Sequence, residues 1–260
     1  MGAAGLGSPR IHVHVPYAKF KEFEPTLRAN RLSIELYLGS QSIDGITERD
    51  LHTLKESMGW GHTISIHGPF MDLSPGAIDS KIAAASLERY LQVISFSEIL
   101  RPEVVVFHSG YEKWKYAGET ELWLSQSVKT WRAVMEKADK SGTRVAIENI
   151  VDTEPDNLRL LAERMDHPNF GLCLDVGHRE IFSKLSITDW VDGMHPYIFE
   201  MHLHDNNGNA DEHLPVGDGI VDFSSLFSRL KALEADPVMT LEAHSSEDAL
   251  KSISRLKNFL

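Results

Sequence analysis

The chain has 260 residues, 42% of them hydrophobic, which is enough to bury a sizeable core, and we expect one barrel-sized domain. Asp and Glu total 38 against 26 Lys and Arg, and the formal net charge of -12 disfavours nonspecific binding to nucleic acid. The single cysteine, Cys173, excludes an internal disulfide framework, so we expect a reducing compartment and take the cytoplasm as the location.

The start of the chain, "MGAAGLGSPR", lacks the apolar core of a secretory signal. No run of the sequence reaches the roughly eighteen apolar residues that a membrane span needs, so we expect no membrane partner. We interpret residues 1–10 as a flexible tail and residues 11–260 as the folded domain. The oligomeric state cannot be read from the sequence.

Short apolar runs alternate with amphipathic stretches along the whole chain. The runs favour strands and lie at residues 10–15, 31–38, 63–68, 103–108, 144–149, 170–176, 198–204 and 238–243. Apolar residues at helical spacing follow four of the runs, at residues 77–100, 119–140, 155–165 and 224–235. Eight nearly all-apolar strands that alternate with helices indicate a parallel sheet covered by helices, and eight strands close a barrel. We therefore predict an α/β fold, a single-domain (β/α)8 TIM barrel. The alternative, a doubly wound sheet, often has a Gly-rich turn after its first strand, whereas "PYAKF" follows here.

Seven of the eight runs carry a histidine or an acidic residue at or near their ends. These residues are Glu35, His67, His108, Glu148, Asp175, His202 and Glu242. In a barrel the carboxyl ends of the strands meet at one mouth, so we expect these side chains to be neighbours. Imidazoles and carboxylates together suit a borderline cation such as zinc or manganese, and carboxylates buried without a cation would repel one another. Any one of them could be a helix cap, but the set predicts a metal centre.

Further candidates flank these strand ends. Asp175 and His178 are three residues apart across a glycine, so a sharp turn could aim both at one centre. Asp211 and His213 are two apart and would point the same way in an extended loop. His204 shares the strand parity of His202 and is either an inward ligand or a residue that orients one, and His14 could line the mouth. The other histidines lack such a setting, and we expect most of them to be surface or packing residues: His12, His52, His62, His167, His195 and His244.

Seven motifs together resemble the xylose isomerase-like TIM-barrel superfamily in order and spacing. They are "SIHGP" (65–69), "FHSG" (107–110), "AIEN" (146–149), "LDVGH" (174–178), "HLHD" (202–205), "DEHLPVGDG" (211–219) and "LEA" (241–243). That superfamily contains sugar and sugar-phosphate isomerases and epimerases as well as the endonuclease IV type of DNA-repair enzyme, AP endonuclease family 2. The resemblance to its epimerases implies one divalent ion, zinc or manganese, held by Glu148, Asp175, His202 and Glu242. The resemblance to the endonuclease IV branch implies up to three zinc ions, which would add His67, His108, His178, Asp211 and His213.

From this resemblance we predict a metal-dependent sugar or sugar-phosphate isomerase or epimerase. It would act through a metal-stabilised enediolate, with Glu148 and Glu242 as the acid and base, and the substrate would meet Glu35, His204 or His14. The alternative is a zinc-dependent phosphodiesterase of the endonuclease IV type, for which nucleic acid would be the partner. That branch has an arginine where this chain has Glu212, and an acidic side chain there would repel phosphate. A metal-stabilised barrel that binds a sugar without turnover is a third possibility.

The loops after the third and fourth runs also carry aromatic residues, Phe70, Tyr111 and Trp114. These side chains could cover a sugar face or stack on an unpaired base. The identity of the substrate, its stereocentre and whether it is phosphorylated depend on loop shapes that the sequence does not specify.

Overall fold

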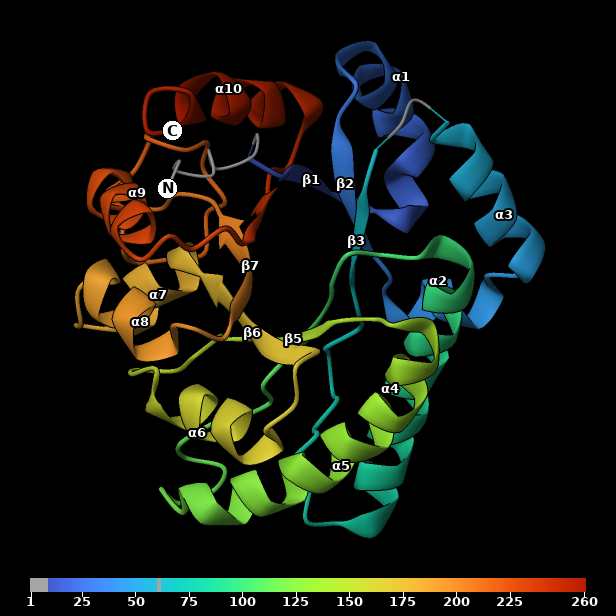
Figure 1. Ribbon diagram of the computed structural model, residues 1–260, viewed down its shortest axis with the longest axis vertical. Coiled ribbons are helices and arrows are strands. Elements are labelled where there is room, and N and C mark those ends of the chain that lie inside the picture. Colours follow the sequence, from blue (N-terminus) through green and yellow to red (C-terminus); the bar gives the residue numbers. More distant parts are fainter. Residues whose placement is uncertain (1–8, 60–61) are drawn as a thin grey trace, which may run out of the picture.

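Eight parallel strands close into a barrel in the computed structural model, which describes residues 9–59 and 62–260 (Figure 1). The strands are β1 (Ile11–Pro16), β2 (Ser33–Tyr37), β3 (Ile64–His67), β4 (Val105–His108), β5 (Val145–Glu148), β6 (Phe170–Asp175), β7 (Ile198–Leu203) and β8 (Val238–Leu241). Each strand pairs in parallel with its neighbours in sequence, and β1 also pairs with β8. The predicted (β/α)8 TIM barrel is therefore confirmed, and all eight predicted runs are strands.

Helices surround the barrel on its outside (Figure 1). They are α1 (Phe20–Asn30), α2 (Ser40–Gly45), α3 (Glu48–Ser57), α4 (Ser80–Leu100), α5 (Thr120–Ser141), α6 (Asp156–Met165), α7 (Val176–Phe182), α8 (Ile187–Met194), α9 (Phe223–Ala232) and α10 (Ser246–Leu256), with a 3-10 turn, η1, at Tyr17–Lys19. The four predicted helices are present and agree within three residues at each end. Asp79 caps the start of α4, where its Oδ1 accepts hydrogen bonds from the backbone N of Lys81 and Ile82.

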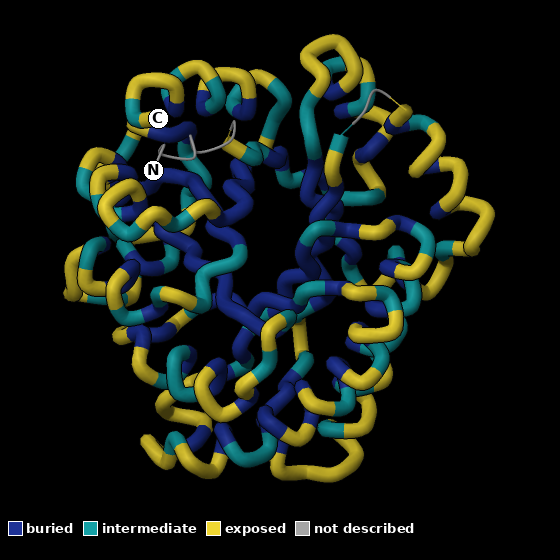
Figure 2. Tube along the Cα trace, in the orientation of Figure 1, coloured by how far each residue is buried: buried dark blue, intermediate teal, exposed yellow. Residues whose placement is uncertain are grey.

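The core lies between the barrel wall and the helices. In Figure 2 the central strands are buried and the outer turns of the helices are exposed. Trp123, Trp131 and Trp190 are fully buried within this layer, because each comes from the inner face of an amphipathic helix. None of the helices in residues 9–59 and 62–260 has the length and apolar character needed to cross a bilayer.

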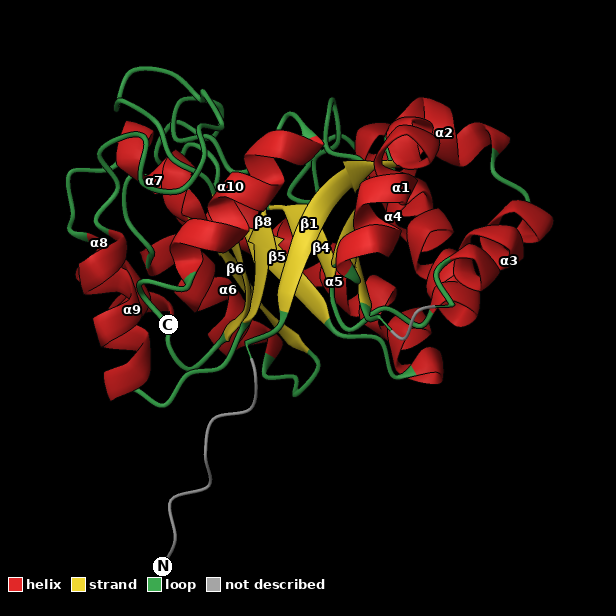
Figure 3. Ribbon diagram, turned by 90° about the horizontal axis from the view of Figure 1, so that it is seen from above, coloured by secondary structure: helices red, strands yellow, loops and turns green. Residues whose placement is uncertain are grey.

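The proposed tail over residues 1–10 falls almost entirely outside the described residues, which begin at Pro9. Arg10 is described, and its Nη1 lies 2.9 Å from Oε2 of Glu103. Figure 3 shows the strands in side view, with loops gathered at the face toward which the strand arrows point. That face is the mouth at which strand-end side chains meet.

Candidate metal centre

The predicted ligands converge on one cavity of about 430 Å³ at the mouth of the barrel. Its lining includes His67, His108, Glu148, His178, Asp211, His213 and Glu242. Asp175 and His202 lie beneath this lining and are fully buried. Each of the nine residues has a side-chain atom within 3.8 Å of another member of the set, which we call the mouth cluster. Six of them come from the ends of β3 to β8, as the strand-end pattern predicts, while His178 comes from α7 and Asp211 and His213 come from the loop between β7 and α9.

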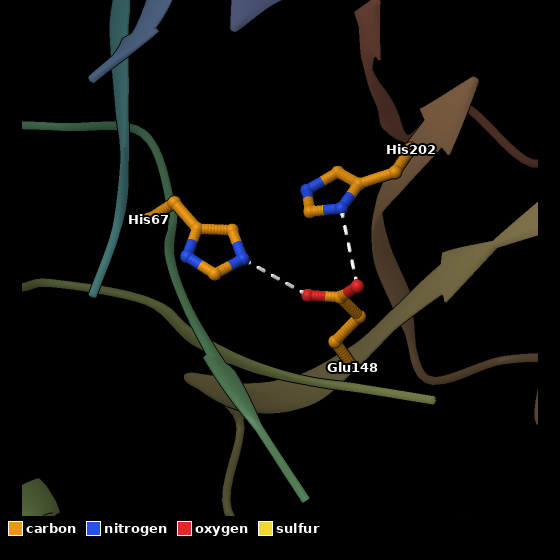
Figure 4. Close-up of side chains that lie close together, drawn as sticks. All are labelled: His67, Glu148 and His202. Carbon is orange, nitrogen blue, oxygen red and sulfur yellow. Dashed lines mark hydrogen bonds and ion pairs between the residues drawn. The ribbon is translucent and has the colours of Figure 1, made fainter. Parts of the chain in front are cut away.

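Glu148, the last residue of β5, lies at the centre of this cluster and is 1% exposed. Its Oε2 is 3.1 Å from Nε2 of His67 and 3.3 Å from Nε2 of His108. Its Oε1 is 3.3 Å from Nδ1 of His178 and 3.5 Å from Nδ1 of His202. Figure 4 shows His67 and His202 on the two oxygens of this carboxylate. Each oxygen of the Glu148 carboxylate therefore contacts ring nitrogens of two different histidines.

The surroundings of the His202 ring show whether these residues could hold a cation. Its Nδ1 is buried and makes no hydrogen bond, although it lies 3.3 Å from Oε1 of Glu242, 3.5 Å from Oε1 of Glu148 and 3.8 Å from Oδ2 of Asp175. Buried polar nitrogens are normally hydrogen-bonded. One imidazole and three carboxylates are a suitable donor set for zinc or manganese. These four residues therefore fit a single divalent ion.

A second group of donors involves the loop between β7 and α9. Oδ2 of Asp211 lies 3.0 Å from Nε2 of His213 and 3.4 Å from Nε2 of His178. The ring of His204 stacks on that of His213 with centroids 4.2 Å apart, and its Nε2 lies 3.1 Å from both oxygens of Asp175. His204 thus contacts a predicted ligand directly and is fully shielded from solvent, which is the arrangement of a residue that orients a ligand.

The loop that carries Asp211 and His213 is held in shape by the carboxylate of Asp205. Oδ1 accepts hydrogen bonds from the backbone N of Asn206 and Val221, and Oδ2 accepts one from the backbone N of Gly217. Gly217 has a φ of +80°, which favours glycine. The "PVGDG" turn is therefore tied back to the end of β7, and this fixes both ends of the donor loop.

Asn149 was not among the predicted site residues, but it fixes the position of Asp175. Its Nδ2 donates to the backbone O of Asp175 at 3.0 Å, and its Oδ1 accepts from the backbone N of Asp175 at 2.8 Å. The signal in the sequence was its place directly after Glu148 in "AIEN". Its side chain ties the ends of β5 and β6 together.

Burial and charge act in opposite directions on the pKa values at the mouth. Burial lowers the pKa of His108 to about 3. Burial would also lower the pKa of His67, but the hydrogen bond to Glu148 and the charge of Glu35 outweigh it and raise that pKa to about 9. Burial would raise the pKa of Glu148, yet the neighbouring imidazoles hold it well below its usual value. Protons on imidazoles thus balance the carboxylates when no cation is bound.

Two predicted substrate contacts lie at different depths. His14 lines the cavity from β1. Glu35 lies in the middle of β2, is fully buried, and is not part of the cavity lining, since Tyr37 forms the end of that strand. Tyr37 lines the cavity instead and could have been inferred, because residues two apart in a strand face the same side.

Some aromatic and histidine predictions need correction. His244 belongs to the group of histidines that we expect mostly to be surface or packing residues, but it lines the cavity, and its ring centroid is 5.1 Å from that of His213. Phe70 also lines the cavity and stacks on His108 with centroids 4.2 Å apart. Tyr111 is buried, Trp114 is 95% exposed, and neither belongs to this lining. Position after "LEA" is the signal that could have identified His244.

The chain belongs to the xylose isomerase-like TIM barrel family, which matches residues 20–259. An uncharacterized protein of Methanocaldococcus jannaschii, MJ1311, is 30% identical over 207 residues, covering 76% of this chain and 70% of that protein. The structure of the TTHB071 protein from Thermus thermophilus, soaked with zinc chloride, is 24% identical with a TM-score of 0.83, covering 96% of this chain and 97% of that one. The crystal structure of a D-tagatose 3-epimerase-like protein is also 24% identical with a TM-score of 0.83, covering 96% of both chains.

Proposed function

We propose that the protein is a divalent-metal-dependent sugar epimerase or isomerase. The observation that carries this proposal is the buried Nδ1 of His202, which faces the oxygens of Glu148, Asp175 and Glu242 without a hydrogen bond. One ion, zinc or manganese, would be held by these four residues. Two structures of the same fold support it, one named as a D-tagatose 3-epimerase-like protein and the other soaked with zinc chloride.

The bound cation would act as a Lewis acid toward the carbonyl and adjacent hydroxyl oxygens of the sugar and so stabilise an enediolate. Glu148 and Glu242 move the proton. One carboxylate removes the proton from the carbon beside the carbonyl, and that C–H electron pair becomes the C=C bond of the enediolate. The other, in its acid form, returns a proton to the opposite face of the same carbon, which inverts the stereocentre. Glu148 ends β5 and Glu242 directly follows β8, and their Oε1 atoms lie 3.5 and 3.3 Å from Nδ1 of His202.

The cavity wall supports a sugar as the substrate. Tyr37 and Phe70 present aromatic rings to the cavity, with centroids 5.8 Å apart. Aromatic side chains combine a large apolar area with defined geometry, which suits the C–H face of a sugar ring.

The direct test is exchange of a substrate hydrogen with solvent. Protein loaded with Mn²⁺, Co²⁺ or Zn²⁺ is incubated with a panel of ketoses and ketose phosphates in D2O, and NMR follows deuterium at the carbon beside the carbonyl. We expect exchange and an epimer or isomer from at least one sugar, and its loss in Glu148→Gln and Glu242→Gln. Unchanged activity in both variants would refute their assignment, and absence of exchange across the panel would refute the function.

A second candidate is a zinc phosphodiesterase of the endonuclease IV type. This candidate is favoured by metal-binding side chains outside the four-residue set. His67 and His108 contact Oε2 of Glu148, and His178 and His213 contact Oδ2 of Asp211. In it, Glu148 would bridge two ions, and His178, Asp211 and His213 would hold a third.

Two features weigh against a nucleic-acid substrate. Of the described residues that line the cavity, Lys19 alone carries a permanent positive charge, whereas phosphate backbones are bound by several Lys or Arg side chains. Glu212 occupies the position of the arginine in that branch, and its Oε2 accepts hydrogen bonds from the backbone N and Nδ2 of Asn207.

Elemental analysis separates the two candidates. The protein is purified without added metal, beside a His213→Ala variant, and ions per chain are counted by mass spectrometry. One ion in both proteins supports the epimerase, while three ions that fall to two in the variant support the phosphodiesterase and lead to assays on abasic DNA.

A further inference from the structure

Glu35 is a charged residue in the wall of the barrel, below the mouth. It is the central residue of β2, is 0% exposed, and pairs in register with His14 of β1 and Ser65 of β3. A buried carboxylate is costly unless it is paired and hydrogen-bonded. Its partners therefore determine what it does.

Both oxygens of this carboxylate are taken by imidazoles. Oε2 lies 3.1 Å from Nε2 of His202, and Oε1 lies 2.7 Å from Nδ1 of His14. Each contact is within hydrogen-bond distance, and a carboxylate can only accept, so both nitrogens donate. With both oxygens engaged and the side chain outside the cavity lining, Glu35 meets imidazoles rather than a substrate hydroxyl.

These contacts determine which nitrogen of His202 can bind a cation. Because Nε2 donates to Glu35, the proton of the neutral ring is on Nε2, and Nδ1 carries the lone pair. Nδ1 is the nitrogen that faces Glu148, Asp175 and Glu242. In Figure 4 the other ring nitrogen of His202 points away from Glu148.

We propose that Glu35 is a positioning residue, which fixes the ring orientation and tautomer of His202 so that Nδ1 is presented to the cation. A carboxylate that accepts from the distal nitrogen of a ligand histidine raises the basicity of that histidine and holds its ring in place. The inference rests on the proposed metal-dependent function, because it assigns Glu35 a role toward the same ion.

The same carboxylate also holds His14, which lines the cavity. Nδ1 of His14 is 3.5 Å from Oε1 of Glu242, so His14 lies between Glu35 and a proposed acid or base. Glu35 therefore links a ligand histidine to a cavity-wall histidine that contacts Glu242. Loss of its charge should disturb the metal site without removing any ligand.

The experiment measures metal affinity and not turnover. Co²⁺ and Zn²⁺ are titrated into metal-free wild-type protein and Glu35→Gln in competition with a chromophoric chelator, and the visible absorption of the Co²⁺ form is recorded. We expect the variant to bind about tenfold to hundredfold more weakly and to show a changed Co²⁺ spectrum, with unchanged far-UV circular dichroism.

Glu200→Gln is the matched control. Glu200 is also a fully buried glutamate. A carboxylate oxygen of Glu200 lies within 4.8 Å of both a carboxylate oxygen of Glu35 and a ring nitrogen of His202. Its own hydrogen bonds, however, come from the hydroxyls of Ser65 and Thr240. The control should keep wild-type Co²⁺ affinity within about twofold and an unchanged spectrum, since it does not touch a ring nitrogen of His202.

The outcomes separate the inference from the function on which it rests. Glu35→Gln with wild-type affinity and spectrum would overturn the inference and leave the proposed function standing. Wild-type protein that binds neither ion would overturn both. If Glu35→Gln does not fold, Glu35→Asp decides, because it keeps the charge but shortens the reach. Weaker binding supports positioning, and wild-type binding in that variant would overturn it.

Discussion

Two polar clusters of the described residues, both built around buried histidine and glutamate side chains, differ in charge. The interior cluster consists of His12, Ser65, Glu200 and Thr240. Nδ1 of His12 lies 2.8 Å from Oγ of Ser65, that hydroxyl donates to Oε1 of Glu200 at 3.0 Å, and Thr240 donates to the same oxygen. In the mouth cluster, by contrast, imidazoles face carboxylates directly.

The pKa values follow this difference. In the interior cluster, burial lowers the pKa of His12 to about 4 and raises the pKa of Glu200 to about 8, and both shifts favour the neutral form. At the mouth, opposite charges overcome burial and raise the pKa of His67 and of His204 to about 9. Buried groups that are neutral and hydrogen-bonded are typical of structural sites, whereas ionised groups with shifted pKa values at a cavity are typical of functional sites. The two clusters therefore differ in charge state as well as in the hydroxyl groups that separate imidazole from carboxylate in the interior cluster.

The largest contrast is expected between Glu148→Gln at the mouth and Glu200→Gln in the interior. Glu148→Gln removes a proposed acid or base and a proposed ligand, so kcat on the active sugar should fall by about 10³. Glu200→Gln should change kcat by less than about threefold, because Glu200 contacts neither the cavity nor a proposed ligand by hydrogen bond. Steady-state kinetics at saturating Mn²⁺ measures both, and similar losses in both variants would contradict the division into two clusters.

The second contrast is in the pH dependence of stability. Because the pKa of His67 and His204 is about 9 in the folded protein against an ordinary value of 6.5, the folded state holds extra protons between these values. That stabilisation is complete below about pH 6.5 and is lost as the pH rises through 9. Metal-free protein should therefore lose about 2–4 kcal/mol of unfolding free energy between pH 7 and 9.

Urea unfolding in EDTA and in saturating Zn²⁺ measures this effect. A bound cation takes over the role of the protons, so the loss should be much smaller in zinc. Glu200 also has a raised pKa, but it titrates in both samples and cancels in the comparison. The same slope with and without zinc would show that the mouth histidines do not carry these protons.

A third contrast compares two glycines. A Cβ at Gly177 would lie 2.0 Å from Cε1 of His204, a ring already held by Asp175, whereas a Cβ at Gly45 would meet nothing within 4 Å. Gly177→Ala should destabilise the metal-free protein by about 1–3 kcal/mol and weaken metal binding, because it displaces His204. Gly45→Ala should be neutral or stabilising by up to about 1 kcal/mol. Urea unfolding measures both, and a neutral Gly177→Ala would mean that the ring of His204 has room to move.

The fold could be predicted from the sequence because each strand is a nearly continuous apolar run and eight such runs are separated by helical patterns. Given a barrel, convergence of the strand ends follows from topology alone, which is why six members of the mouth cluster could be gathered from distant parts of the chain. The other three, His178, Asp211 and His213, were predicted from their spacing along the chain and from the family resemblance.

Depth within the barrel could not be predicted. Glu35 is predicted at or near the end of its strand, and it lies two residues inside β2, where Tyr37 occupies the end. The stagger between neighbouring strands sets depth, and no single strand records it. His244 directly follows "LEA", and this position is a signal in the sequence, but the direction of its side chain depends on the backbone path after β8, which residue types do not specify.

The smallest effect is expected from His12→Leu in the interior cluster. Nε2 of His12 bonds Oγ1 of Thr63, which is exposed to solvent, and Ser65 keeps its hydrogen bond to Glu200 when the imidazole is removed. Water can therefore replace the bond to Thr63, and Ser65 still has a hydrogen-bond partner. The unfolding free energy of His12→Leu should fall by only about 1 kcal/mol. Metal content and kcat should match the wild type, whereas His202→Leu should lose the ion. Calorimetry and elemental analysis of both variants test this, and loss of metal in His12→Leu would mean that the two clusters act as one.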